Sequence, residues 1–102
     1  MMPPHLSGAP KITGDVLVFQ GYSLNYTDPD SELSVVDLDT GEELAFSWSM
    51  EEVRQDRSGG AANPPPGAIQ YRCVLTVRLE GVEVGKTYSV SYVDEVYEVL
   101  AR

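Results

Sequence analysis

One cysteine and one histidine are the residues of this 102-residue chain that suit nucleophilic catalysis. A catalytic thiol needs a base within hydrogen-bond reach, and a third group must orient that base. Cys73 lies on the apolar side of an alternating run, where a thiol is usually inert packing. His5 lies in a proline-rich segment at the start of the chain, which we do not expect to be held rigidly. We therefore expect no Cys–His pair, no cofactor and no enzymatic activity.

Two groups of carboxylates have a spacing that superficially suits an oxygen-liganded cation such as calcium. Asp28, Asp30 and Glu32 occupy alternate positions, but a calcium-binding loop needs glycine at its sixth position, where this chain has Leu33. The group at 37–43 fails similarly, because its glycine falls one place early. We interpret both groups as solvated turn carboxylates and expect no metal site. A melting temperature raised by calcium would reverse that interpretation.

Strands must position these side chains, because alternation with a period of two residues is the clearest pattern in the chain. Residues 69–79 alternate throughout, with Val74 as the one interruption. Shorter alternating runs cover 22–27, 44–50 and 87–92. The residues that share the apolar sides are Tyr22, Leu24, Tyr26, Leu44, Phe46, Trp48, Met50, Ile69, Tyr71, Cys73, Leu75, Val77, Leu79, Tyr88, Val90 and Tyr92.

Two further runs, 16–19 and 33–38, are apolar on both sides, which is typical of central strands. A last run covers 96–101. The turns that separate these runs are Asp28-Pro29-Asp30-Ser31, Asp39-Thr40-Gly41, Gly81 to Gly85 and Asp94-Glu95. Six or seven short strands with short links predict an all-β fold, either an antiparallel β-sandwich or a small β-barrel.

Two segments leave alternatives open. Ser49 to Glu52 has the form of a capping box, so 51–57 is either a short helix or a continuation of the preceding strand. A long Pro- and Gly-rich loop follows within 54–68, and its three consecutive prolines favour an extended conformation. We divide the chain into a proline-rich N-terminal arm, 1–10, and a single sandwich domain, 11–102.

The segment from Val82 to Tyr92 resembles the tyrosine-corner strand of fibronectin type III and related immunoglobulin-like domains. In those domains a tyrosine shortly after a glycine-bearing turn begins a strand, and its hydroxyl binds the upstream connection. Tyr88 would be that tyrosine, and Trp48 would be the tryptophan of the sandwich core. The resemblance implies an immunoglobulin-like sandwich and no particular activity. The chain departs from the pattern by lacking the usual proline in the turn and by its longer 58–67 loop.

The charge balance restricts the possible partners. Sixteen acidic residues against seven basic ones give a formal net charge of −9, which argues against nucleic acid and anionic membranes. Many acids fall in turns, so we expect an acidic coat and a partner protein with a basic docking surface. The start of the chain lacks the pattern of a signal peptide, so we expect a protein made in the cytoplasm.

We expect a non-enzymatic structural subunit that docks into a larger protein complex. In size, acidity and strand pattern the chain is similar to the small all-β connector or decoration proteins of tailed phages, which implies a virion. The alternative is an immunoglobulin-like module that binds a glycan or peptide through exposed tyrosines. A third possibility is a partner strand added at 96–100. The residues predicted to contact the partner are Pro3, Pro4, His5, Leu6, Tyr22, Tyr26, Asn63, Pro64, Pro65 and Pro66.

Overall fold

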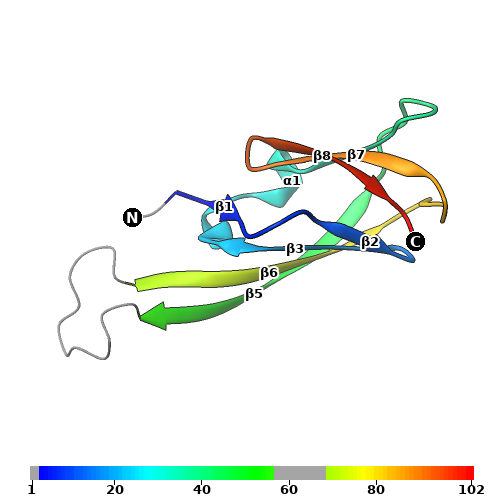
Figure 1. The fold of residues 1–102 in the computed structure, drawn as a ribbon. Helices are drawn as coiled ribbons and strands as arrows, with labels where there is room; N and C mark the ends of the chain where they lie inside the picture. The colour runs from blue at the N-terminus through cyan, green and yellow to red at the C-terminus, as the bar shows by residue number, and fades with distance from the viewer. Residues whose placement is uncertain (1–2, 57–68) are drawn as a thin grey trace.

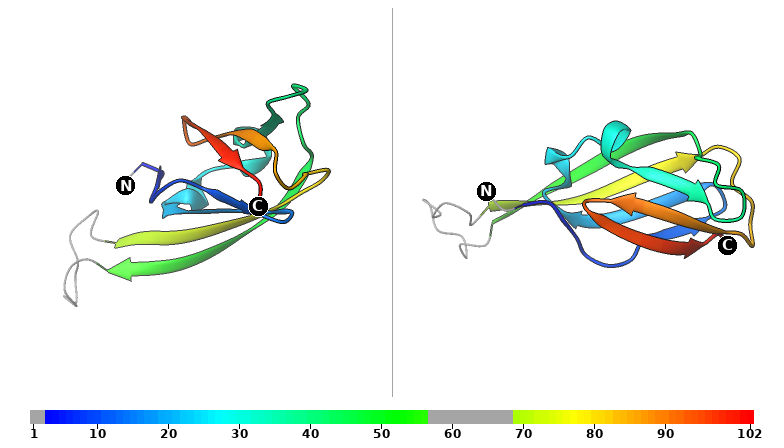
Figure 2. Two further views of the ribbon diagram at one scale, coloured as in Figure 1. Left: turned by 45° about the vertical axis from the view of Figure 1, so that its right-hand side comes forward. Right: turned by 90° about the horizontal axis from the view of Figure 1, so that it is seen from above.

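Two antiparallel β-sheets lie one above the other in the computed structural model, which describes residues 3–56 and 69–102 (Figures 1 and 2). The larger sheet has the order β1-β3-β6-β5 with β2 also paired to β3, and the smaller has the order β4-β7-β8. The strands are β1 (His5–Leu6), β2 (Lys11–Thr13), β3 (Val16–Tyr22), β4 (Ser34–Asp37), β5 (Phe46–Asp56), β6 (Ile69–Leu79), β7 (Thr87–Tyr92) and β8 (Glu95–Leu100).

The all-β prediction is confirmed at this level, with two antiparallel sheets that do not close into a barrel. The described residues hold eight strands, because the short strands β1 and β2 add to the predicted set. Strands β5 and β6 pair over eleven residues each, from Phe46 opposite Leu79 to Asp56 opposite Ile69. The strand alternative for 51–56 is therefore correct and the capping-box interpretation is wrong. The remaining loop residues, 57–68, lie outside the described residues.

The core fills the space between the sheets and confirms the predicted alternation over 71–79 and 87–92. Phe19 of β3 packs against Tyr92 of β7 with ring centroids 4.9 Å apart at 62°. Burying one such apolar side chain contributes about 1.5–3 kcal/mol. The buried apolar residues are Ile12, Leu17, Phe19, Leu24, Leu33, Val35, Leu44, Cys73, Leu75, Val77, Leu79, Tyr88, Val90, Tyr92, Val99 and Ala101.

The two open sides of the sandwich are bridged differently. On one side, the Gly14 N–H donates to the Arg102 carbonyl at 2.7 Å, and the Arg102 N–H donates to the Ile12 carbonyl at 3.2 Å. On the other side, the indole Nε1 of Trp48 donates to Asp30 Oδ1 at 2.9 Å. The prediction that Trp48 fills the core is therefore wrong. Trp48 is 37% exposed, because β5 is the edge strand of its sheet.

The strand predicted over 22–27 and the loop predicted over 28–31 are both incorrect. Ser23 adopts a left-handed conformation, with φ of 61°, and this ends β3. A 3-10 helix, η1 (Leu24–Tyr26), follows. The next residues form one turn of helix, α1 (Pro29–Glu32), because the Asp28 side chain accepts the Asp30 N–H and proline suits the first helical position.

The run 33–38 is not a central strand. Strand β4 is the edge of the smaller sheet, and its free side binds the chain that follows it: Asp37 N–H donates to the Glu42 carbonyl at 2.8 Å. The run 16–19 is central as predicted, because β3 lies between β6 and the short strands β1 and β2. The turn at Gly41 adopts the expected left-handed conformation, with φ of 75°.

The contact that a tyrosine corner requires is present at the start of β7. Tyr88 is buried, and its hydroxyl accepts the Glu83 N–H at 2.8 Å. This hydrogen bond ties the first residues of the strand to the connection after β6. The expected role of the Tyr88 hydroxyl is confirmed, while membership of the immunoglobulin-like family stays a prediction.

Candidate functional site

Strand β1 places two predicted contact residues, His5 and Leu6, against the end of β3 (Figure 1). His5 pairs with Tyr22, and their rings stack with centroids 5.2 Å apart at 23°. Leu6 pairs with Gly21 and is half-buried. The structure therefore brings His5, Leu6 and Tyr22 together. At these positions the N-terminal arm is therefore part of the sandwich, as an edge strand of the larger sheet.

The other predicted contact residues do not form a common patch by alternation. Tyr26 is 55% exposed, but it lies in the 3-10 helix, so no strand carries both Tyr26 and Tyr22 on one face. Pro3 is exposed and Pro4 is half-buried, just before β1. Residues 63–66 lie outside the described residues. An exposed stripe of Tyr22 and Tyr26 would require both residues to lie on one strand, and they do not.

Cationic side chains collect on the outer face of the larger sheet, which none of the described elements covers (Figure 1). Residues paired directly across a sheet share a face, so the register gives Lys11, Arg72 and Arg78 the direction away from the core. In the strands of this sheet, Glu51 is the one acidic residue with the same direction. We define the cationic face as Lys11, Val16, Val18, Arg72, Val74, Thr76 and Arg78.

Apolar side chains occupy the middle of the cationic face. Its three valines are half-buried, whereas Thr76 and the three cations are exposed. A surface hollow of about 200 Å³ lies at one end, lined by Val16, Thr76 and Arg78 together with residues of β5. An exposed sheet face of this composition suits contact with another protein surface, and a carboxylate there would meet arginine guanidinium groups.

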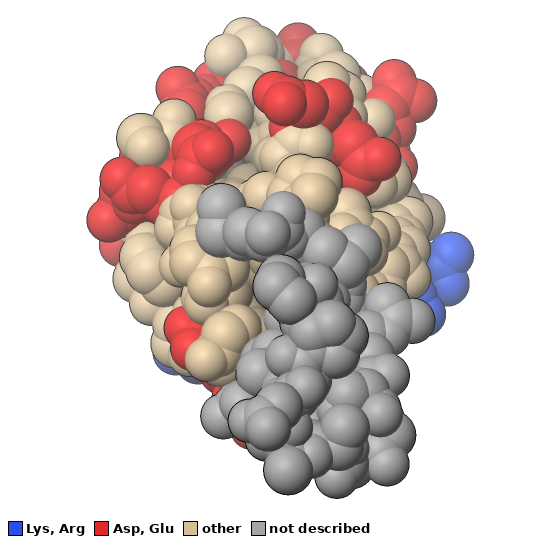
Figure 3. All heavy atoms as spheres, turned by 90° about the vertical axis from the view of Figure 1, so that its left-hand side faces the viewer, with Lys and Arg blue, Asp and Glu red and all other residues tan. Residues whose placement is uncertain are grey.

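Acidic side chains gather at a different place, the end of the molecule that Figure 3 presents. Helix α1 contributes exposed Asp30 and Glu32, and its capping residue Asp28 is also exposed. The turn between β7 and β8 contributes exposed Asp94 and Glu95. The acidic excess is therefore not uniform: these turns and α1 are acidic, and the cationic face carries the opposite charge.

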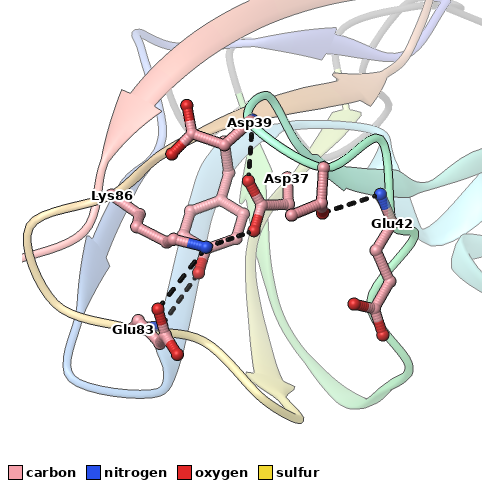
Figure 4. A network of polar contacts seen from close by, with 7 residues as sticks. Asp37, Asp39, Glu42, Glu83 and Lys86 are labelled. Carbon is pink, nitrogen blue, oxygen red and sulfur yellow. Dashed lines mark hydrogen bonds and ion pairs between the residues drawn. The ribbon is translucent and has the colours of Figure 1, made fainter.

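A network of polar contacts joins β4 to the start of β7 (Figure 4). Lys86 Nζ donates to Asp37 Oδ2 at 2.8 Å and lies 3.4 Å from Glu83 Oε2. Asp37 Oδ1 also accepts the Asp39 N–H at 2.8 Å. The hydrogen bond from Lys86 lowers the pKa of Asp37, and the same bond raises the pKa of Lys86. These ion pairs tie the connection before β7 to the end of β4.

The thiol and the imidazole lie on opposite faces of the larger sheet. Cys73 is fully buried toward the core, and its Sγ lies 3.6 Å from both Asn25 Oδ1 and the Tyr71 carbonyl. His5 has the outward register of Tyr22, next to Arg72. In residues 3–56 and 69–102, no group of three or more His, Cys, Asp or Glu side chains is placed to hold a metal ion. Helices long and apolar enough to cross a membrane are also absent from this described part.

Comparison with protein families, curated proteins and solved structures finds no match for this chain. Its function is therefore inferred from its surfaces. The cationic face was missed at the level of sequence, although Arg72 and Arg78 already stood on the polar side of the 69–79 alternation. Lys11 carried no such signal, because β2 is three residues long.

Proposed function

We propose that this chain is a non-enzymatic structural subunit that docks into a larger protein complex through the cationic face. The observation that carries the proposal is the pairing of half-buried valines with Lys11, Arg72 and Arg78 on a sheet face that no described element covers. Protein interfaces commonly combine an apolar centre with charged groups at the rim, and arginine is enriched in them.

The partner at this face is an acidic protein surface. Carboxylates facing Arg72 and Arg78 would gain charge-assisted hydrogen bonds, and complementary charge speeds association. The acidic turns elsewhere fit the basic docking surface expected from the composition, so the subunit would present opposite charges to two neighbours. Both contacts would weaken as salt screens the charges.

The complex to test first is a virion, on the similarity in size, acidity and strand pattern to accessory proteins of tailed phages. We also propose an immunoglobulin-like topology for the sandwich, which the Tyr88 contact supports. The alternative function, a module for a glycan or peptide, relied on exposed Tyr22 and Tyr26. It has less support, because Tyr22 is half-buried and stacks on His5.

Sedimentation of tagged chains in extracts of the source cells tests the docking proposal. Wild type should sediment with large assemblies, and Arg72→Gln/Arg78→Gln should shift to the monomer fractions at about 0.15 M salt, where surface charges still interact over about 8 Å. Both arginines are exposed, so the variant should keep the melting temperature of wild type.

A matched control changes the net charge equally at another place. Leu38→Glu/Val84→Glu likewise makes the net charge more negative by two, at side chains that are 48% and 68% exposed and lie outside the larger sheet. This control should sediment like wild type. Wild type found solely as small species, or both double variants lost equally from the assemblies, would refute docking through the cationic face.

A further inference from the structure

Strand β8 is an open edge of the smaller sheet. Along its length it pairs with β7. Among the described residues, β2 approaches its other side at the far end, where residues 98–100 and 10–13 line a common hollow and where Ala101 and Arg102 bond to β2. The opposite edge, β4, is different because the chain at 42–44 binds its free side. Open edges present backbone groups to which a further strand can bind.

The backbone groups on the open side of β8 belong to its even-numbered residues. Ala101 N–H donates to the Lys86 carbonyl at 2.9 Å, so odd-numbered residues direct their hydrogen bonds toward β7. The two-residue turn at Val93 and Asp94 agrees, because it makes the flanking Tyr92 and Glu95 a pair. The N–H and C=O groups of residues 96 and 98 therefore face outward.

The side chains of β8 also favour an added strand. Val96 is 69% exposed and Leu100 is 44% exposed, and the strand contains no proline or lysine, the residues that commonly protect open edges. The other open edge, β5 of the larger sheet, carries consecutive glutamates, Glu51 and Glu52, with one directed to each face of the sheet.

We propose that β8 pairs with β8 of a second copy of this chain, antiparallel and around a two-fold axis at Tyr97. The buried faces of the two sheets lie on the same side only if one residue of β8 pairs with the same residue of the second copy, so that the axis lies between these two residues. The registers that pair five residues of each strand are centred on Tyr97 or on Glu98. A centre at Glu98 places two glutamates directly opposite, which is unfavourable, so Tyr97 remains.

This register satisfies the outward backbone groups. Val96 of one copy and Glu98 of the other form a hydrogen-bonded pair, and symmetry repeats that pair on the far side of the axis. Glu95 faces Val99 of the second copy, and the two Tyr97 residues form the closely spaced central pair. The two smaller sheets thereby join into one continuous sheet, and exposed Val96 becomes covered.

One unfavourable contact remains and gives the dimer a characteristic salt dependence. The two Glu98 side chains lie diagonally across the axis, about 7–8 Å apart in standard sheet geometry. Salt screens this repulsion, so self-association should strengthen from about 0.05 to 0.5 M NaCl. Docking through the cationic face should weaken over the same range, which separates the two proposals experimentally.

Sedimentation equilibrium of the full chain at about 1 µM to 1 mM measures the self-association. Val96→Glu should weaken dimerisation about tenfold or more, because it places a glutamate directly opposite Glu98 of the second copy on both sides of the axis. Val84→Glu is the matched control: Val84 is 68% exposed but lies outside β8, so the dimer should be unchanged. Glu98→Thr should tighten the dimer about threefold by removing the repulsion.

Cysteine cross-linking tests the register itself. Tyr97→Cys should form a disulfide between two copies on oxidation, while Val96→Cys and Glu98→Cys should cross-link with each other and not with themselves. The native Cys73 is buried and does not compete. Wild type that stays monomeric throughout the concentration range overturns the proposal. Binding of another protein's strand to this edge, with no dimer formed, overturns it as well. Efficient self-linking of Glu98→Cys overturns the Tyr97 register.

Discussion

Replacing Gly21 with alanine should detach strand β1 from the larger sheet. Gly21 lies in β3 between Leu6 of β1 and Cys73 of β6. A β-carbon at this position would lie 2.3 Å from the His5 carbonyl oxygen, which is backbone and closer than any real contact allows. Because β1 is two residues long, we expect it to move away and leave β3 and β6 in place.

The cost follows from the contacts that hold β1. The Ser7 N–H donates to the Gln20 carbonyl at 2.8 Å, and such a bond contributes about 1 kcal/mol net. The His5–Tyr22 stack contributes about 0.5–1.5 kcal/mol, and half-burial of Leu6 about 1 kcal/mol. Freeing the arm recovers conformational entropy, so the net loss is smaller than the sum of these contacts. We therefore expect Gly21→Ala to lower the free energy of unfolding by about 1–2 kcal/mol.

Urea denaturation of four proteins measures this effect: wild type, Gly21→Ala, the chain lacking residues 1–7, and the shortened chain carrying Gly21→Ala. In the shortened chain the alanine has no carbonyl to meet, so it should be neutral or stabilise by up to about 0.5–1 kcal/mol, the usual advantage of alanine over glycine in a strand. An equal loss of stability in the full and shortened chains would refute the clash with His5.

Two further predictions concern the polar contacts of β7. Tyr88→Phe removes the acceptor of the Glu83 N–H and should lower the free energy of unfolding by about 1–2 kcal/mol. For a domain of this size, each kcal/mol lowers Tm by roughly 4–8 °C. Tyr26→Phe, at an exposed tyrosine, is the control; equal Tm values for both variants would contradict the tyrosine-corner role. The pKa of Asp37 is lowered from 3.8 by Lys86, so its contribution is present above pH 3.8 and is lost as pH falls through the folded-state pKa. Lys86→Met should flatten that acid limb of an unfolding curve measured against pH, and an unchanged limb would disprove the linkage.

Local sequence patterns predicted the strands whose side chains fill the core between the two sheets. In β6, Cys73, Leu75 and Val77 alternate with polar residues because one side of the strand is buried and the other is solvated. The resemblance of residues 82–92 to a tyrosine-corner strand likewise implied the hydrogen bond that Tyr88 makes. These features depend on the chain within a few residues, so the sequence alone carries them.

The incorrect predictions come from places where the neighbours of a residue decide its state. Trp48 has the inward register of Val77, as alternation implied, but its strand is the edge of the sheet, so its ring stays partly exposed. The alternation at 22–27 has no structural meaning, because the left-handed backbone at Ser23 ends the strand. A single conformational change there redirects every side chain that follows.

The sequence by itself determined an all-β domain, its main strands, and the outward position of Arg72 and Arg78 in the polar half of an alternating run. The tertiary structure alone decided that Lys11 and the valines of β3 join those arginines on one face. It alone also made β8 an open edge. The physical reason is that hydrogen bonding between strands far apart in the chain sets strand order and register, and no local pattern encodes which strands become neighbours.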